Sequence, residues 1–459
     1  MLEKLMVPNV RQLLEAGDET TLAEALDRWL PADVAAVLRE LYESERVAAF
    51  RLLKGPQAVH AFEYLERQTQ KRLLEQLPPD YTARLLNEMA PDDRTALLVE
   101  FPQSEFERFL ALMSDEQRSI ARSLLQFPQN SVGRLMTPDY VVAREHWTIR
   151  ELLDFVRTHG KDSESLNVVY VVDPDLRLID DIRMRQVLLA QPETTLAALM
   201  DRQFVALQVT DDKRIAVDMF RRYDRTALPV VDGDGILRGM VTIDDVLDVA
   251  EQFATSEIQR LGGSEALEEP YVQTPLLTMV RKRASWLVVL FLGELLTATA
   301  MGYFEKEIER AVVLALFVPL IISSGGNSGS QAATLIVRAL ALGEVRLRDW
   351  WFVLRRELIS GALLGTILGT IGFLRIAIWS GFSDIYGPHW LLVGLTVGFS
   401  LVGIVLWGTI SGSMLPFVLK RLTLDPATSS APFVATLVDV TGLVIYFTVA
   451  LVILKGTLL

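Results

Sequence analysis

The last long apolar segment of the chain, residues 431–454, reads APFVATLVDVTGLVIYFTVALVIL and contains one charged residue, Asp439. A helix needs about 20 mostly apolar residues to cross the hydrocarbon core of a bilayer, so this segment is long enough to span one. A carboxylate at the bilayer centre costs at least about 2.5 kcal/mol on insertion scales, and such residues usually face a bundle interior or a water-filled path. We therefore expect Asp439 to line a route for a cation. A structural hydrogen bond or ion pair between helices is the alternative.

Five apolar segments in the second half of the chain reach spanning length. They lie near residues 285–304, 311–340, 351–378, 391–419 and 431–454. Basic connections at 281–283, 338–356 and 420–421 alternate with acidic ones at 305–309 and 383–386. Because basic loops stay in the cytoplasm, we expect a multi-pass protein in a lipid bilayer, with a cytoplasmic N-terminal region and the C-terminus outside.

The negative charge of the chain is concentrated in its first part. The net charge is −13, but residues 271–459 carry 14 Lys and Arg against 10 Asp and Glu, which leaves −17 on residues 1–270. An acidic surface disfavours phosphate binding, so nucleic acid is not an expected partner. It concentrates cations, although it also suits a domain that is simply soluble.

The content of cysteine and histidine limits the kinds of metal site that the chain can form. The chain has no cysteine and four histidines, which excludes disulfides and thiolate sites and favours a hard cation bound by oxygen. The amphipathic, acidic first residues do not have the pattern of a signal peptide.

Residues 1–130 contain short amphipathic segments, several of which begin with proline, a residue tolerated in the first helical turn. We expect an all-α, superhelical domain of repeated helices. The expected helices are 22–30, 31–43, 47–53, 56–68, 70–76, 79–89, 91–100 and 114–126.

Residues 131–250 contain an internal duplication with a spacing of about 60 residues. Strand signals at 168–173 (VVYVVD) and 228–232 (LPVVD) end in turn residues, and each follows a Leu-Met pair, a strand and a helix. The pattern resembles a tandem CBS-domain pair, and residues 227–246 match it well. In the first copy, residues 178–182 read LIDDI where that family has an apolar strand entered by glycine, so we expect an altered strand there. The CBS resemblance makes ATP a possible ligand, with Thr242 and Asp245 as the candidate residues.

A polar helix is expected at 252–261, ended by Gly262 and Gly263. The second span then contains Pro319 and the run SSGGNSGSQ at 323–331. Its glycines permit close helix packing, and carbonyls freed from the helix could also face a cavity. Asn327 and Gln331 are four residues apart on one helix face, which favours a polar pore lining.

The runs NSVGRLMTP (130–138), GGNSGSQ (325–331) and PFVATLVD (432–439) together resemble the MgtE family of bacterial magnesium channels over essentially the whole chain. The resemblance implies four parts: a helical domain at 1–130, α/β tandem CBS domains at 131–250, a connecting plug helix at 251–275 and a pore domain of five transmembrane helices at 276–459. It also implies a homodimer in the bacterial inner membrane whose pore holds hydrated Mg²⁺. The pore residues it implies are Asp439, the Ala435 carbonyl, and Gly326, Asn327, Ser330 and Gln331, with Ser330 replacing an Asn common in the family.

The resemblance further implies that cytoplasmic Mg²⁺ bridges carboxylates and holds the pore closed. Matching positions for this regulatory metal are Asp212, Asp224, Asp245, Asp248 and Glu257. Phe253 and Ser256 stand where the connecting helix usually carries acids. This departure predicts fewer bridging ions, weaker or shifted closure, or a different closed interface.

We therefore expect a Mg²⁺-selective, Mg²⁺-gated channel rather than an enzyme, and no phosphate-binding loop of an ATPase occurs. Transport of Co²⁺, Mn²⁺ or divalent cations more broadly is the alternative within transport. A CBS-regulated membrane enzyme would need paired catalytic groups in the spans, where Asp439 and Glu294 lie on separate helices. A nucleotide sensor anchored by its spans would leave Asp439 unexplained. Glu294, midway along the first span, is a second intramembrane acid for which a cation contact and a structural role both remain open.

Overall fold

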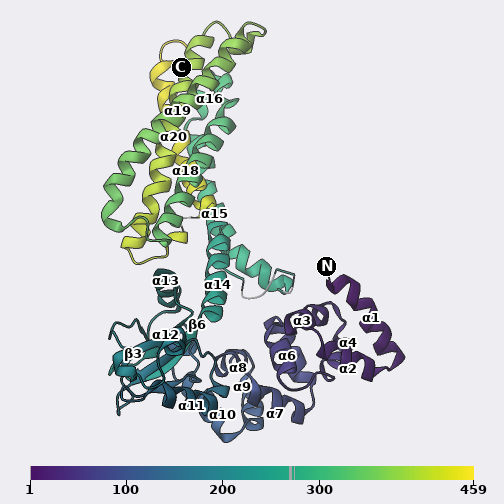
Figure 1. Cartoon of the computed structure of the whole chain (residues 1–459). Helices are drawn as coiled ribbons and strands as arrows, with labels where there is room; N and C mark the ends of the chain where they lie inside the picture. The colour runs from purple at the N-terminus through teal and green to yellow at the C-terminus, as the bar shows by residue number, and fades with distance from the viewer. Residues whose placement is uncertain (1, 268–270, 273, 429, 459) are drawn as a thin grey trace. The chain divides into compact units, whose positions relative to one another are not determined.

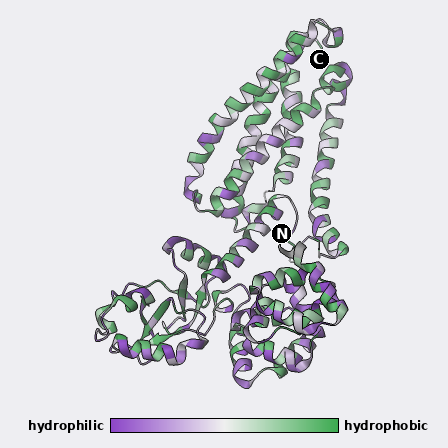
Figure 2. Cartoon of the chain, turned by 45° about the vertical axis from the view of Figure 1, so that its right-hand side comes forward, coloured by the Kyte–Doolittle hydropathy of each residue, from purple (hydrophilic) through white to green (hydrophobic). Residues whose placement is uncertain are grey.

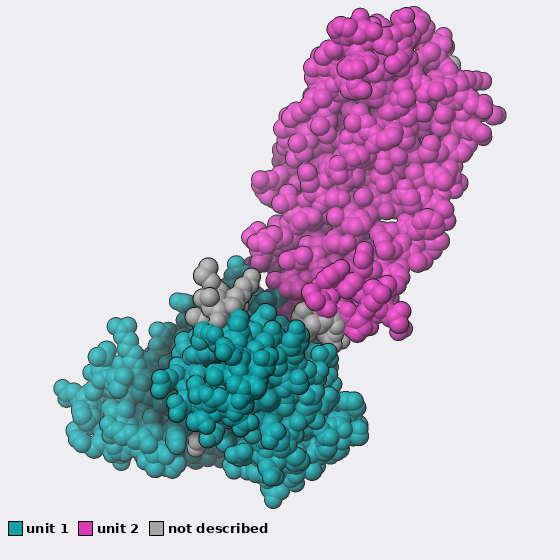
Figure 3. Space-filling model, turned by 90° about the vertical axis from the view of Figure 1, so that its right-hand side faces the viewer, with its two compact units in different colours: residues 1–251 teal, residues 252–459 magenta. Residues whose placement is uncertain are grey.

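The computed structural model describes residues 2–267, 271–272, 274–428 and 430–458. The chain divides into two compact units, residues 1–251 and residues 252–459 (Figure 3). The first unit contains a helical region followed by two small sheets, and the second contains long apolar helices. The expected fold class, an all-α region, an α/β CBS pair and a helical membrane domain, is confirmed.

The described residues 2–125 form ten short helices. Helices two apart in the sequence pack on each other, for example α1 on α3, α5 on α7 and α8 on α10, as in a superhelix of repeats. Proline lies in the first turn of α3, α5, α7 and α8, where its missing N–H costs no helical hydrogen bond. Helices α1 and α9 lie outside the helices expected from the sequence. The bounds are α1 Leu2–Ala16, α2 Glu19–Asp27, α3 Pro31–Glu40, α4 Glu43–Phe50, α5 Gly55–Glu63, α6 Arg67–Gln76, α7 Pro79–Glu88, α8 Pro91–Leu98, α9 Gln103–Leu112 and α10 Asp115–Leu125.

The expected duplication is present as two three-stranded sheets with the same strand pattern. In each sheet the first pair of strands is parallel and the second pair is antiparallel, with a register irregularity at the equivalent place. One apolar cluster contains residues of both sheets, including Tyr170 and Met240, so each repeat covers the other. The strands are β1 Val142–Ala143, β2 Val168–Val172, β3 Leu178–Arg183, β4 Leu207–Gln208, β5 Ala227–Val231 and β6 Leu237–Thr242, and the helices are α11 Ile149–His159, α12 Met184–Leu189 and α13 Lys213–Tyr223.

The expectation of an altered strand at 178–182 is wrong. Strand β3 is regular and pairs with β2 as β6 pairs with β5. Its two acids fit because both have partners. The buried Asp180 carboxylate accepts hydrogen bonds from the backbone N–H groups of Asp181 and Arg202, at 2.9 and 3.0 Å. Asp181 forms an ion pair with Arg225, with 3.2 Å between Oδ2 and Nη1.

The connecting helix is longer than expected. Helix α14 runs from Ile243 to Leu261, so the expected helix at 252–261 is the second part of a helix that begins directly after β6. Nothing in residues 243–252 breaks a helix, which explains why it continues. It ends as expected at Gly262 and Gly263, and Gly263 has a φ of +74° that favours glycine.

Among its described residues, the second unit contains five stretches long and apolar enough to span a membrane, as predicted (Figure 2). In Figure 1, α18, α19, α20 and α21 form a bundle. The most extensive contacts are between α19 and α20 and between α18 and α20, while α15 packs along α21. The bounds are α15 Leu276–Tyr303, α16 Glu305–Arg310, α17 Val312–Ala315, α18 Val318–Ala341, α19 Trp350–Ser380, α20 Trp390–Arg421 and α21 Ala431–Ile453.

The polar run of the second span is helical throughout, so the expectation of carbonyls freed within it is wrong. The interruption lies earlier, between α17 and α18, and Pro319 occupies the first turn of α18. The glycines of the run instead allow close contact between helices. A Cβ at Gly329 would lie 2.8 Å from Val434 Cγ1 and 3.0 Å from the Gly408 carbonyl oxygen. Helix α18 is therefore held against both α20 and α21.

Candidate functional site

Asp439 lies on α21 where this helix meets α18. A Cβ placed on Gly326 would be 3.5 Å from Asp439 Oδ1 and 3.4 Å from Ala435 Cβ, so the missing side chain at 326 leaves room beside the carboxylate. Asp439 is half-buried. Across the described part of the chain no hydrogen-bond donor is paired with it, and Glu294 is the charged group that acts on it. An unpaired carboxylate inside an apolar bundle can take a cation.

A polar stripe follows one side of α18 next to this carboxylate. Its members recur at helical spacings of three and four, and all are exposed in the single chain: Ser323, Asn327, Gln331, Thr334 and Arg338. Asn327 Nδ2 donates a hydrogen bond to Ser323 Oγ at 3.3 Å, within the stripe. A lipid-facing helix would not present such a stripe, so it faces water, protein or both.

The structure separates the expected pore residues into two groups. Gly326, Ala435 and Asp439 lie together where α18 meets α21, and Ser330 Oγ donates a hydrogen bond to the Ala431 carbonyl at 2.9 Å. Asn327 and Gln331 lie on the neighbouring open face of α18. In the sequence, Ser323 and Thr334 continue the helical spacing of Asn327 and Gln331 in both directions. This spacing was the signal from which a longer polar face on the helix could have been predicted.

Glu294 lies on α15, the helix beside α21. Its side chain is exposed in the single chain, and the preceding Gly293 touches α21, because a Cβ there would be 2.9 Å from Thr436 Cγ2. The structure thus brings the two intramembrane acids of the sequence analysis close to each other.

A second group of carboxylates lies within residues 1–251. Asp245 and Asp248, both on α14, interact electrostatically with Asp93 of α8. Asp92, Glu164 and Asp244 complete the group, which we call the acid cluster. Asp92, Asp93, Glu164 and Asp244 were not expected from the sequence. An acidic first turn such as Pro91-Asp92-Asp93 is an ordinary helix start, so it carried no signal.

Burial and mutual repulsion raise the proton affinity of this cluster. Burial raises the pKa of Asp92 well above its usual value, and repulsion from the Asp245 carboxylate raises it further. Burial also raises the pKa of Asp245 to about 7, although a hydrogen bond from Thr242 Oγ1 at 2.8 Å opposes the change. The pKa values of Asp93, Glu164 and Asp248 are raised, in each case chiefly by burial. A bound cation would relieve the same repulsion that a proton relieves.

The carboxylates of the cluster are not arranged as a compact inner-sphere site. Among the described residues, no three His, Cys, Asp or Glu side chains are grouped closely enough to hold a metal ion directly. Mg²⁺ keeps several of its waters and is commonly bound through one or two carboxylates, so bridging through hydration water does not require such a group.

The remaining expected regulatory residues are not part of the acid cluster. Asp212 caps the N-terminus of α13, where it accepts a hydrogen bond from the Arg214 backbone N–H at 2.9 Å. Asp224 ends the same helix with a φ of +50°, so the two acids lie about 18 Å apart along its axis. Glu257, Phe253 and Ser256 lie in the later part of α14, in the second unit.

The candidate nucleotide residues differ between the repeats. In the second repeat, Thr242 is the last residue of β6, and its hydroxyl donates to Asp245 in the next helix. The equivalent positions of the first repeat are Arg183 and Gln186, whose side chain accepts from the Arg183 backbone N–H. A carboxylate that could bind ribose hydroxyls is therefore present in the second repeat and absent at the equivalent position of the first.

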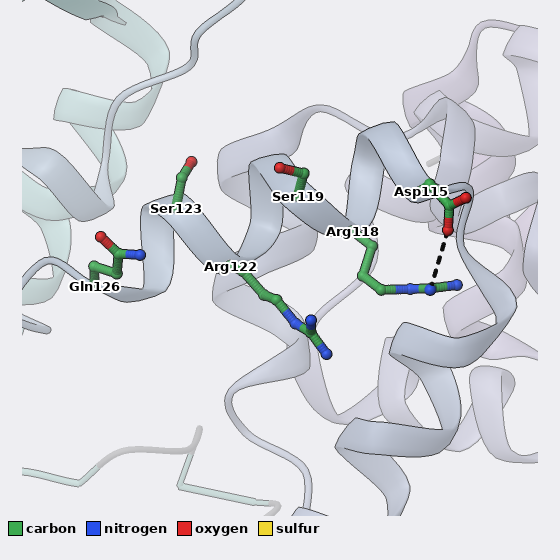
Figure 4. A pocket seen from close by; sticks show the side chains of 6 residues that line it. All are labelled: Asp115, Arg118, Ser119, Arg122, Ser123 and Gln126. Carbon is green, nitrogen blue, oxygen red and sulfur yellow. Dashed lines mark hydrogen bonds and ion pairs between the residues drawn. The ribbon is translucent and has the colours of Figure 1, made fainter.

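A surface depression elsewhere carries no comparable chemistry (Figure 4). It lies along α10, and its lining consists of side chains of that helix and of its C-cap residue Gln126, with an ion pair between Arg118 and Asp115 at 3.2 Å.

Comparison with known proteins agrees with this arrangement. Residues 318–449 match a family model described as divalent cation transporter, residues 29–130 match an MgtE intracellular N domain, and residues 196–251 match a CBS domain. The magnesium transporter MgtE of Thermus thermophilus is 38% identical over 461 aligned residues, which cover 99% of this chain and 100% of the relative. The chain belongs to the MgtE family.

Other MgtE relatives are more distant or shorter. The magnesium transporter MgtE of Bacillus subtilis is 28% identical over 74% of this chain and 73% of its own length. The crystal structure of the cytosolic domain of the Mg²⁺ channel MgtE in complex with ATP covers 53% of this chain and 99% of its own, at 33% identity and a TM-score of 0.51. The soluble part of a magnesium transporter covers 55% and 99%, at 25% identity and a TM-score of 0.52. The curated MgtE relatives are named as transporters, which are not enzymes.

Proposed function

We propose that the protein is a Mg²⁺-selective channel that takes up magnesium across the bacterial inner membrane and is gated by cytoplasmic Mg²⁺. The observation that carries the proposal is the unpaired Asp439 carboxylate, half-buried within an apolar helix and facing the gap left by Gly326. Membership of a family whose curated members are named magnesium transporters supports the choice of ion.

In this proposal two copies of the chain form a homodimer around the pore. The polar stripe of α18 is exposed in one chain and the Asp439 carboxylate is half-buried, and pairing with a second copy would remove both from lipid. The alternating loop charges support a cytoplasmic N-terminal region and an external C-terminus.

The chemistry of the site suits a hydrated ion. Mg²⁺ loses water slowly and prefers octahedral oxygen coordination. Two Asp439 carboxylates, the Ala435 carbonyls and the amides of Asn327 and Gln331 could recognise its hydration shell. Contacts through water bind the ion without trapping it, and conduction requires release as well as binding.

The acid cluster is our candidate for the sensor. Without a cation, ionised Asp92, Asp93 and Asp245 repel one another, which disfavours the arrangement that brings α8 and α14 together. Mg²⁺ binds that arrangement preferentially and therefore raises its population. ATP is proposed as a ligand of the second CBS repeat, at Thr242 and Asp245, with support from the ATP complex of the related cytosolic domain.

Uptake in a magnesium-auxotrophic host tests the proposal. Asp439→Ala should abolish growth at low Mg²⁺ while the protein still inserts and dimerises, and normal uptake by this variant would refute the pore assignment. Competition between ions tests selectivity, because Co²⁺ or Mn²⁺ taken up better than Mg²⁺ would indicate a broader divalent-cation transporter. An open probability that does not change with cytoplasmic Mg²⁺ would refute the gating part alone.

A further inference from the structure

Glu294 is a carboxylate midway along a membrane-spanning helix, and the proposed pore does not yet use it. Within residues 274–428 and 430–458 no basic side chain forms an ion pair with it, and its side chain is exposed in the single chain. A carboxylate in contact with lipid at this depth is costly, so it must face protein or water in the assembled protein.

The packing of α15 on α21 determines the position of Glu294 along the helix axis relative to Asp439. Gly293 lies against Thr436, and the Phe304 ring stacks on the Phe447 ring with centroids 4.9 Å apart. Both contacts join residues with the same offset in sequence number, so the two helices run side by side and in parallel. With that offset Asp439 is level with Leu296, and Glu294 lies about 3 Å from the level of Asp439 along the helix axis. The electrostatic interaction between Glu294 and Asp439 is consistent with this register.

Thr297 provides a second polar group at the same level. It follows Glu294 by three residues on α15, is 7% exposed, and its hydroxyl has no hydrogen-bond partner among the described residues. Threonine in a membrane helix usually returns its hydroxyl to a carbonyl of the preceding turn, as Thr299 does to Leu295 at 3.1 Å. An unpaired hydroxyl less than one helical turn from Glu294 is available to a ligand that donates hydrogen bonds, such as the water of a hydrated cation.

We infer that Glu294 and Thr297 form a second cation-binding position beside Asp439, which takes a hydrated divalent cation in the ion path. This inference rests on the proposed pore and extends it. Each chain then contributes two carboxylates at nearly one level, and Gly293 permits this by allowing α15 to approach α21 closely. A higher negative charge density favours a divalent over a monovalent cation, so Glu294 acts as a selectivity residue.

Concentration-dependent flux into proteoliposomes tests the inference in the full-length protein. Glu294→Gln should raise the Mg²⁺ concentration for half-maximal flux about tenfold, as loss of a close charge contact does, and lower the preference for Mg²⁺ over Na⁺. Glu294→Asp should retain most of that preference. The matched control is Glu305→Gln, which removes the same charge from the start of α16 and should leave both quantities unchanged.

Cysteine accessibility gives a readout that a purely structural role would not produce, because the chain has no cysteine of its own. In Glu294→Cys, a membrane-impermeant charged thiol reagent should react, and Mg²⁺ should slow the reaction. Leu292→Cys, on the opposite side of α15, should not react. Wild-type half-saturation and selectivity in Glu294→Gln, or absence of Mg²⁺ protection at position 294, would overturn the inference. Given such a result for Glu294, the variant Asp439→Asn separates two explanations. Normal conduction by Asp439→Asn would refute the proposed pore itself, whereas an inactive Asp439→Asn would refute only the role of Glu294.

Discussion

The acid cluster predicts that the cytosolic region becomes less stable as the pH rises when Mg²⁺ is absent. Burial raises the pKa of Asp245 from 3.8 to about 7. The folded state therefore holds a proton that the unfolded state has already released between these two values, and stability falls with rising pH over that range. Between pH 6 and pH 8 this one group lowers the free energy of unfolding by about 1.4 kcal/mol, and it has no further effect at higher pH. The raised pKa of Asp92 acts in the same direction.

Mg²⁺ should reverse the effect, because it competes with protons for the same carboxylates and binds the ionised cluster. The assay is urea unfolding of a fragment of residues 1–261, monitored by the fluorescence of Trp29 and Trp147. Millimolar Mg²⁺ should stabilise this fragment more at pH 8 than at pH 6, and Asp92→Asn should reduce both the pH dependence and the Mg²⁺ effect. Asp218→Asn, an exposed acid on α13, is the control and should change neither. Stability that stays constant or rises from pH 6 to pH 8 without Mg²⁺ would refute the reasoning.

Two further predictions concern packing. A Cβ at Gly412 would collide with the Gly329 carbonyl oxygen, so Gly412→Ala should destabilise the membrane domain by about 1–3 kcal/mol, visible as a lower melting temperature in detergent. Gly302→Ala, where a Cβ meets no atom within 4 Å, should have little effect, and equal melting of the two variants would contradict the packing. Arg225→Met leaves the Asp181 carboxylate buried without its ion-pair partner and should cost about 3–5 kcal/mol in urea unfolding of the 1–261 fragment, whereas a loss below about 1 kcal/mol would show that the pair is not needed.

The features predicted best from the sequence are those set by local pattern. The five spans follow from apolar length, and β2 and β5 appear within one residue of the strand signals at 168–173 and 228–232. The start of α14 was missed because this helix begins in the first compact unit and continues into the second. The composition of the sequence does not mark the boundary between the two units. Strand β3 was judged irregular from its acids, whereas partners distant in sequence, Arg202 and Arg225, accommodate them.

The candidate site shows the same division. Asp439 stands out in the sequence because a charge in an apolar helix is costly wherever the helix lies. The acid cluster does not stand out, because Asp92 and Asp93 lie far in sequence from Asp245, and each acid alone resembles a solvated surface residue. The register that places Glu294 beside Asp439 depends on how α15 packs along α21, for which the sequence contains no local signal.

The most direct test of the account is Mg²⁺ flux through purified protein in proteoliposomes with an imposed membrane potential, comparing the wild type with Asp439→Asn. This substitution removes the charge and preserves the size of the side chain. We predict that the wild type carries a potential-driven Mg²⁺ flux and that Asp439→Asn, reconstituted at the same density, carries none above empty liposomes. Wild-type flux through Asp439→Asn would contradict the central claim that this carboxylate binds the conducted ion.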